Sequence, residues 1–144
     1  ALKNKKALIA VISAYMLFFA SFTNYYYKDY AKNFATFSGA GLKEAAERVK
    51  ELEGKVYVDS SIEYPALLFY LQQDTNEYLK TKEYINYPSP YLYVSGFGRY
   101  TFVDDIYENG IYIFRKGYAD IFEKTGYNVE YYNNIIICYK TGTN

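Results

Sequence analysis

Four polar residues lie at the end of a short β-rich stretch, KVYVDS at residues 55–60, and just after it, and their types suit the binding of a sugar or a phosphate. In open α/β sheets, ligands bind at the carboxyl ends of strands, where hydroxyl and carboxylate groups can hydrogen-bond them. The sequence therefore offers a candidate ligand-facing set, which is Asp59, Ser60, Ser61 and Tyr64.

Turn chemistry competes with this interpretation. Ser60 and Glu63 have the spacing of a capping box, in which each side chain bonds the other residue's backbone N–H. Pro65 suits the first turn of a helix, and a helix that begins there would weaken the box. Of the two interpretations, the cap or turn is favoured over a ligand site.

A second candidate motif is SGFGR, which runs from Ser95 to Arg99 after an expected strand. Glycine-rich turns can hold a phosphate through their backbone N–H groups. The motif lacks the third glycine of the dinucleotide fingerprint and the Lys-Ser/Thr of a P-loop. A tight turn is therefore favoured, and Ser95 and Arg99 stay as candidate ligand-facing residues.

Carboxylates at Asp104, Asp105 and Glu108 could bind a hard cation, but their spacing differs from that of an EF-hand loop. A solvated loop is the favoured interpretation. Carboxylate pairs also serve glycosidases, yet acidic residues are scattered along this chain, 16 in 144 residues, and single out no pair.

Composition excludes several kinds of chemistry. The chain has no His, so no Ser-His-Asp or Cys-His triad can form. Its one cysteine, Cys138, lies in the apolar stretch IIICY and is expected to be a small buried hydrophobe. The formal net charge of zero gives no indication of a nucleic-acid partner. We therefore expect no catalytic residue, no metal site and no cofactor in this segment.

The first thirty residues determine in which compartment the rest of the chain is expected to lie. Residues 7–27 contain no charge, and as a helix they would reach roughly 31 Å, about the thickness of a bilayer core. Three lysines precede this stretch, and Tyr25, Tyr26 and Tyr27 close it. The positive-inside rule then predicts a cytoplasmic flank at 1–6, a transmembrane helix at 7–27 and an extracytoplasmic domain at 28–144 in the cell membrane.

Two alternatives to a membrane span remain open. A cleaved signal peptide would share the basic start, but Phe18 before Ala20 does not suit a small-x-small cleavage site. A core helix would need more protein around it than this chain offers. The start at Ala1 fits either a removed initiator or a piece of a longer chain.

The remaining residues are expected to form a small three-layer α/β domain with a mixed sheet. Residues 42–54 form an amphipathic helix that buries Leu42, Ala45, Ala46, Val49 and Leu52 and turns Lys43, Glu44, Glu47, Arg48, Lys50 and Glu51 to water. A helix is expected within 62–73, a short helix at 118–124, and strands at 55–60, 91–95 and 110–115. Residues 99–103 are expected as a loop or an edge strand. Asn133-Asn134 predicts a closing antiparallel hairpin of 127–132 with 135–139, because Asn tolerates positive φ.

The order of these features resembles a known family. After an apolar helix that ends in aromatics come the patterns F-x-x-x-G-L-x-E-A from Phe37, K-V-Y-V-x-S-S-I-x-Y-P from Lys55, L-L-F-Y-L from Leu67, S-x-F-G-R-Y from Ser95 and G-Y-N-V from Gly126. The chain resembles the C-terminal extracytoplasmic domain of bacterial GT-C membrane glycosyltransferases of family 39, which are similar to dolichyl-phosphate-mannose protein mannosyltransferases.

The resemblance implies a terminal span and an outward-facing accessory domain of a polytopic enzyme that uses a polyprenyl-phosphate-sugar donor. The catalytic acid of such enzymes lies in the first external loop, so this segment would be non-catalytic by itself. Expected partners are the membrane, the rest of a larger membrane protein, and a sugar or acceptor. The alternative is a single-pass anchored module that binds a glycan or a protein through its many tyrosines. A pilin-like subunit is a third reading, although the acidic residue usual near the start of a pilin helix is missing.

Overall fold

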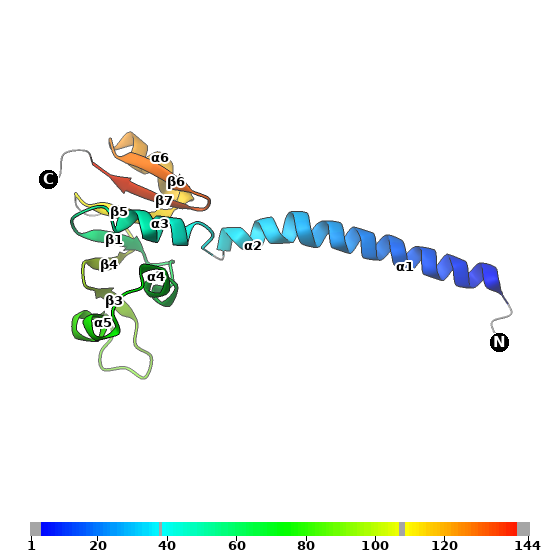
Figure 1. The fold of residues 1–144 in the computed structure, drawn as a ribbon, viewed down its shortest axis with the longest axis horizontal. Coiled ribbons are helices and arrows are strands. Elements are labelled where there is room, and N and C mark those ends of the chain that lie inside the picture. Colours follow the sequence, from blue (N-terminus) through cyan, green and yellow to red (C-terminus); the bar gives the residue numbers. More distant parts are fainter. Residues whose placement is uncertain (1–3, 38, 107–108, 141–144) are drawn as a thin grey trace. The chain divides into compact units, whose positions relative to one another are not determined.

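The computed structural model describes residues 4–37, 39–106 and 109–140 (Figure 1). The chain divides into two compact units, Ala1–Ser38 and Gly39–Asn144, and each is described by itself.

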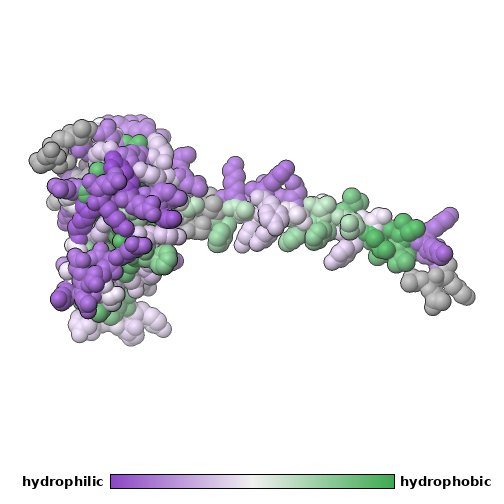
Figure 2. Space-filling model, viewed as in Figure 1, coloured by the Kyte–Doolittle hydropathy of each residue, from purple (hydrophilic) through white to green (hydrophobic). Residues whose placement is uncertain are grey.

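The first unit is a single helical rod. Helix α1 (Lys5–Tyr25) passes through a π-helical turn, Tyr26–Tyr30, into α2 (Ala31–Phe37). The stretch Lys5–Phe34 is long and apolar enough to cross a membrane, with a mean hydropathy of 1.7 and none of its apolar window buried. Figure 2 shows green and pale residues along α1 and purple residues at its start. The helix runs on past Lys28 as far as Phe37.

Aromatic rings form a ladder along one side of this rod. Phe22, Tyr26, Tyr30 and Phe34 stand four residues apart, and successive ring centroids are 5.9, 5.4 and 6.1 Å apart. Side chains at this spacing are neighbours on a helix surface and stabilise it. The ladder therefore supports the helix through its π-helical turn and past the end of the uncharged segment.

The second unit is built on one mixed seven-stranded sheet in the order β2-β3-β4-β1-β5-β7-β6. The central strand β1 (Val56–Asp59) pairs in parallel with β4 (Tyr100–Val103) and β5 (Ile111–Arg115). The other pairs are antiparallel and involve β2 (Glu83–Tyr84), β3 (Val94–Phe97), β7 (Ile135–Tyr139) and β6 (Asn128–Tyr132).

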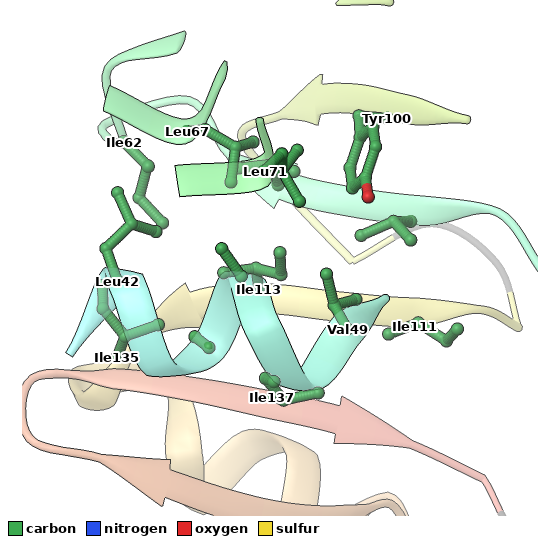
Figure 3. Packing of buried hydrophobic residues seen from close by; sticks show 14 of the residues in the cluster. Leu42, Val49, Ile62, Leu67, Leu71, Tyr100, Ile111, Ile113, Ile135 and Ile137 are labelled. Atoms are coloured by element: carbon green, nitrogen blue, oxygen red, sulfur yellow. The ribbon is translucent and has the colours of Figure 1, made fainter. Parts of the chain in front are cut away.

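Helices cover both faces of this sheet and complete three layers. Helices α3 (Leu42–Val49) and α4 (Tyr64–Leu71) pack on one face, where Ile111, Ile113 and Ile137 point (Figure 3). Helix α6 (Ala119–Lys124) packs on the other face, against Tyr112, Phe114 and Cys138. Both faces of the central strands are apolar because both are covered, which is typical of α/β sheets. The predicted three-layer α/β class with a mixed sheet and a C-terminal hairpin is confirmed.

Two elements differ from the expectation in the middle of the chain. Residues 100–103 were expected as a loop or an edge strand, but β4 lies inside the sheet between β3 and β1. The expected strand at 91–95 begins only at Val94. Tyr91, Leu92 and Tyr93 belong to the loop before β3. The alternation of apolar and polar residues alone does not show which of them pair with a neighbouring strand.

A helix that the sequence analysis missed, α5 (Thr75–Thr81), follows α4. Its start is fixed by the Asp74 carboxylate, which accepts a hydrogen bond from the Glu77 N–H at 2.9 Å. An Asp followed three residues later by Glu is a helix-start signature, and it was present in the sequence.

Helix α3 buries Leu42, Ala45, Ala46 and Val49 of the predicted stripe, while Leu52 lies beyond the helix and is only partly buried. The helix also differs from the prediction in two other details. It ends at Val49 rather than near Gly54. Arg48, expected to face water, is half-buried and bonds Glu130 of β6. The hairpin turn is confirmed, since Asn133 adopts a φ of 53° between β6 and β7.

Candidate ligand pocket at the carboxyl ends of β1 and β4

A pocket of about 510 Å³ opens where β1 and β4 end and α4 begins. Its polar lining comes from Ser60, Glu63, Tyr64 and Asp104. Its apolar lining comes from Ile62, Pro65, Ile85, Tyr93, Val94 and Phe102. Apolar walls with a few convergent polar groups are the usual make-up of a small-molecule site. The carboxyl ends of parallel strands are also where open α/β sheets bind ligands.

Asp59 supports the floor of this region without lining the pocket. It is the one buried charged residue among those described. Its carboxylate accepts hydrogen bonds from the backbone N–H groups of Ser61, at 2.9 Å, and Arg115, at 3.3 Å. A carboxylate that bonds the N–H two residues ahead forms an Asx turn. The turn interpretation of residues 59–61 is therefore supported, because the Asp59 side chain forms the turn.

Ser60 and Asp104 connect the ends of the two parallel strands. The Ser60 hydroxyl donates to the Asp104 carboxylate, and the Ser60 N–H donates to the Val103 carbonyl at 3.0 Å. The capping box predicted for Ser60 and Glu63 was wrong. Glu63 is itself the N-cap residue of α4, and its side chain makes no capping hydrogen bond. The Ser60 hydroxyl does not cap the helix either, because it donates to Asp104 after β4.

The remaining candidates do not all meet at this pocket. Tyr64 lines it and stacks on Tyr78 of α5, with ring centroids 6.5 Å apart. Ser61 is exposed beside the pocket, where its hydroxyl accepts a hydrogen bond from the Arg115 guanidinium at 3.1 Å. Ser95 is half-buried within β3 and is not part of the lining.

Arg99 lies at the opposite end of the strands from Asp59, as the Val56–Tyr100 pairing requires. Its guanidinium donates to the carbonyl oxygens of Val49 at 2.6 Å, Gly54 at 3.3 Å and Leu52. These carbonyls belong to the end of α3 and the turn after it, where the last four carbonyls of a helix lack partners within it. In the structure, Arg99 thus caps a helix.

The pocket's other members, above all Glu63, Phe102 and Tyr93, were not predicted as ligand-facing from the sequence. A signal existed for Asp104, because it directly follows β4 just as Asp59 ends β1. It was overlooked because residues 100–103 were not assigned to the interior of the sheet. Of the carboxylates considered for a cation, Glu108 lies outside the described residues. Among the described residues, no three His, Cys, Asp or Glu side chains gather as metal ligands.

Cys138 is fully buried under α6, as expected from its apolar neighbours. Burial, and then the nearby negative charge of Glu123, raises the pKa of its thiol to about 12. Because the thiolate is the nucleophile, this environment suits a structural cysteine.

The chain matches no protein-family model, no curated protein and no solved structure. The chemistry of the pocket itself therefore carries the functional argument.

Proposed function

We propose that this chain is a membrane-anchored, outward-facing binding domain that holds the sugar part of its ligand in the pocket at the ends of β1 and β4. In this proposal it serves as the terminal span and accessory domain of a polytopic glycosyltransferase with a polyprenyl-phosphate-sugar donor. The observation that carries the proposal is the pocket, which combines apolar walls with hydrogen-bond acceptors at its edge.

The chemistry of a sugar fits this lining. A sugar ring has apolar C–H faces and a rim of hydroxyl donors. Tyr64, Tyr93 and Phe102 offer flat apolar surface, and a tyrosine ring adds a polar hydroxyl at its tip. The Glu63 and Asp104 carboxylates accept hydrogen bonds from hydroxyl groups, and such charge-assisted bonds are the stronger kind.

The N-terminal helix supports the membrane part of the proposal. It is long and apolar enough to cross a bilayer, and the lysines at its start favour a cytoplasmic position for that end under the positive-inside rule. Residues 28–144 would then be extracytoplasmic, on the side where the family that the chain resembles acts on its acceptors.

The pocket is tested by sugar binding to the full chain in lipid nanodiscs. A panel of glycans identifies the ligand, and calorimetry compares Asp104→Asn with Asp105→Asn. Asp105 is exposed next to Asp104 and does not line the pocket. We expect Asp104→Asn to weaken binding about tenfold, the effect of roughly 1.4 kcal/mol, while Asp105→Asn binds as the unchanged chain does. Absence of binding to any glycan, or equal loss in both variants, would refute the pocket assignment.

The accessory role is tested separately, on the coding region upstream of Ala1. A series of further apolar spans with an acidic residue in the first outward loop supports the glycosyltransferase. Removal of residues 39–144 should then reduce sugar transfer or alter acceptor choice.

A single-pass anchored glycan- or protein-binding module is the second candidate. It is favoured by one observation, that every residue lining the pocket belongs to the unit Gly39–Asn144. A start codon directly before Ala1, together with sugar binding, would establish this candidate over the first.

A further inference from the structure

The connection between β2 and β3, residues 85–93, displays aromatic and aliphatic side chains to solvent. We name it the aromatic loop. It lies within the longest uncharged stretch of the domain, residues 84–98, which has no Asp, Glu, Lys or Arg. Its exposed large side chains are Ile85, Tyr87, Tyr91, Leu92 and Tyr93. Tyr91 is 79% exposed and Tyr87 is 76% exposed, so most of the surface of each side chain is open to solvent.

The loop holds a defined shape while it displays these rings. Asn86 fastens it from within: its side-chain amide donates to the Tyr91 carbonyl, and its side-chain oxygen accepts from the Tyr93 N–H at 2.9 Å. The Ile85 N–H donates to the Tyr93 carbonyl at 3.0 Å. Figure 1 shows the loop extending from the end of the sheet that carries β2 and β3. The matching end of the domain in Figure 2 is pale and green rather than deep purple.

The composition of the loop is suited to the boundary between lipid and water. Tyrosine collects at this boundary because its ring is apolar and its hydroxyl stays hydrated. A charged side chain would have to be dehydrated on entry, and the loop has none. Pro88 and Pro90 have no N–H groups, so they add no donor that would lack a partner away from water.

The N-terminal apolar helix would hold the domain close to a lipid surface. Only Ser38 separates α2, which continues the apolar helix, from the first residue of the domain unit. A tether of this kind turns a second contact into an intramolecular one with a high effective concentration. Even a loop with a modest affinity for lipid would therefore be bound to the membrane most of the time.

We propose that the aromatic loop inserts into the interfacial region of the bilayer that the N-terminal helix spans, as a second membrane contact of the domain. This proposal rests on the membrane anchor and not on sugar binding in the pocket. Ile85 and Tyr93 of the loop also line the pocket, but Tyr87, Tyr91 and Leu92, the residues that the test changes, do not, so the two proposals can fail independently.

The chain contains no tryptophan, so a single introduced tryptophan reports on one position. Tyr91→Trp places it in the aromatic loop, and Ile121→Trp places it on α6. Ile121 is an exposed apolar residue, 49% accessible, and α6 packs beside β6, at the far edge of the sheet from β2. Each full-length variant is reconstituted in phosphatidylcholine–phosphatidylglycerol vesicles, with and without phosphatidylcholine brominated on its acyl chains.

We expect the Tyr91→Trp emission to be blue-shifted and quenched severalfold more by the brominated lipid than the Ile121→Trp emission. Introducing Tyr87→Asp and Leu92→Asp into the Tyr91→Trp chain should abolish the excess quenching, while the far-ultraviolet circular dichroism stays unchanged. Equal quenching at both positions would overturn the proposal. So would a blue shift without quenching that disappears when the protein is diluted in lipid, because it would show a second copy of the chain on the loop.

Discussion

Arg48 on α3 and Glu130 on β6 form a two-pronged ion pair across 82 residues of sequence. The Arg48 Nε and Nη2 atoms each donate to a different Glu130 carboxylate oxygen at 3.0 Å. The hydroxyl groups of Tyr132 and Tyr139 donate to the same carboxylate, each at 2.7 Å. The pair thus fastens a helix of one layer to the edge strand of the sheet. A fork-to-carboxylate arrangement of this kind is geometrically specific as well as strong.

Glu130 should make the stability of the domain depend on acidity. Hydrogen bonds from Arg48, and then from Tyr132 and Tyr139, lower the pKa of the Glu130 carboxyl from 4.5 to about 2. The folded state therefore favours the charged carboxylate. Its stabilising contribution is fully present above about pH 4.5 and is lost as the pH falls toward about 2.

We predict that Glu130→Gln lowers the free energy of unfolding near neutral pH by about 1–2 kcal/mol, because hydrogen bonds to charged groups are lost. The free energy of unfolding of the variant should also lack the fall between pH 4.5 and about 2 that is due to protonation of Glu130. Urea titrations of the full chain in detergent across this range measure both effects. Glu47→Gln, on the exposed face of α3, is the control and should change little. An unchanged acid dependence in Glu130→Gln would contradict the assignment.

Arg99 should matter for stability rather than for ligand binding. Its planar guanidinium donates to three carbonyl oxygens at the end of α3 and in the turn after it, which an ammonium group at the end of a lysine cannot all reach. We predict a loss of about 1–2 kcal/mol for Arg99→Lys and a larger loss for Arg99→Met. Thermal unfolding measures these losses. Any glycan found to bind the chain should bind Arg99→Lys with unchanged affinity. A weaker affinity would show that Arg99 contributes to ligand binding.

Gly41 should be replaceable by no other residue. A Cβ at this position would lie 1.8 Å from the Tyr132 carbonyl oxygen, and φ is +93°. We predict that Gly41→Ala destabilises the domain by about 3 kcal/mol or more, because backbone must move. Gly98, with φ of +52° and no atom within 4 Å of the added Cβ, is the matched comparison. Gly98→Ala should cost only about 1–2 kcal/mol, the strain of the left-handed conformation. Equal losses in urea titrations of the two variants would show that the contact with Tyr132 has no effect.

Cys138 should resist thiol reagents in the folded protein. Burial raises the pKa of its thiol to about 12, so very little thiolate is present at pH 8, and reagent cannot reach it. We predict negligible labelling by iodoacetamide in the folded chain and rapid labelling in urea, followed by mass spectrometry. Prompt labelling without urea would mean that α6 opens readily from the sheet.

The sequence by itself determined the elements whose signals are local. The uncharged stretch at 7–27, the stripe from Leu42 to Val49 and the Asn133-Asn134 turn each depend on residues that are close in the chain. Helix periodicity, hydropathy and turn preference act over that range. The alternation along β5 and β7, where Ile113 and Phe114 face opposite layers, likewise follows from the geometry of a single strand.

Only the tertiary structure decided which distant residues meet. The pairing of β4 with β1 brings Asp104 beside Ser60 and so forms the pocket, while it moves Arg99 to the opposite end of the strands. The packing of α3 on the sheet brings Arg48 to Glu130. Strand order depends on free energies summed over the whole core, because many alternative pairings satisfy the same local patterns. The sequence therefore pointed to Ser60 and Tyr64 of the pocket lining, but their grouping with Glu63, Phe102 and Asp104 is a property of the folded sheet.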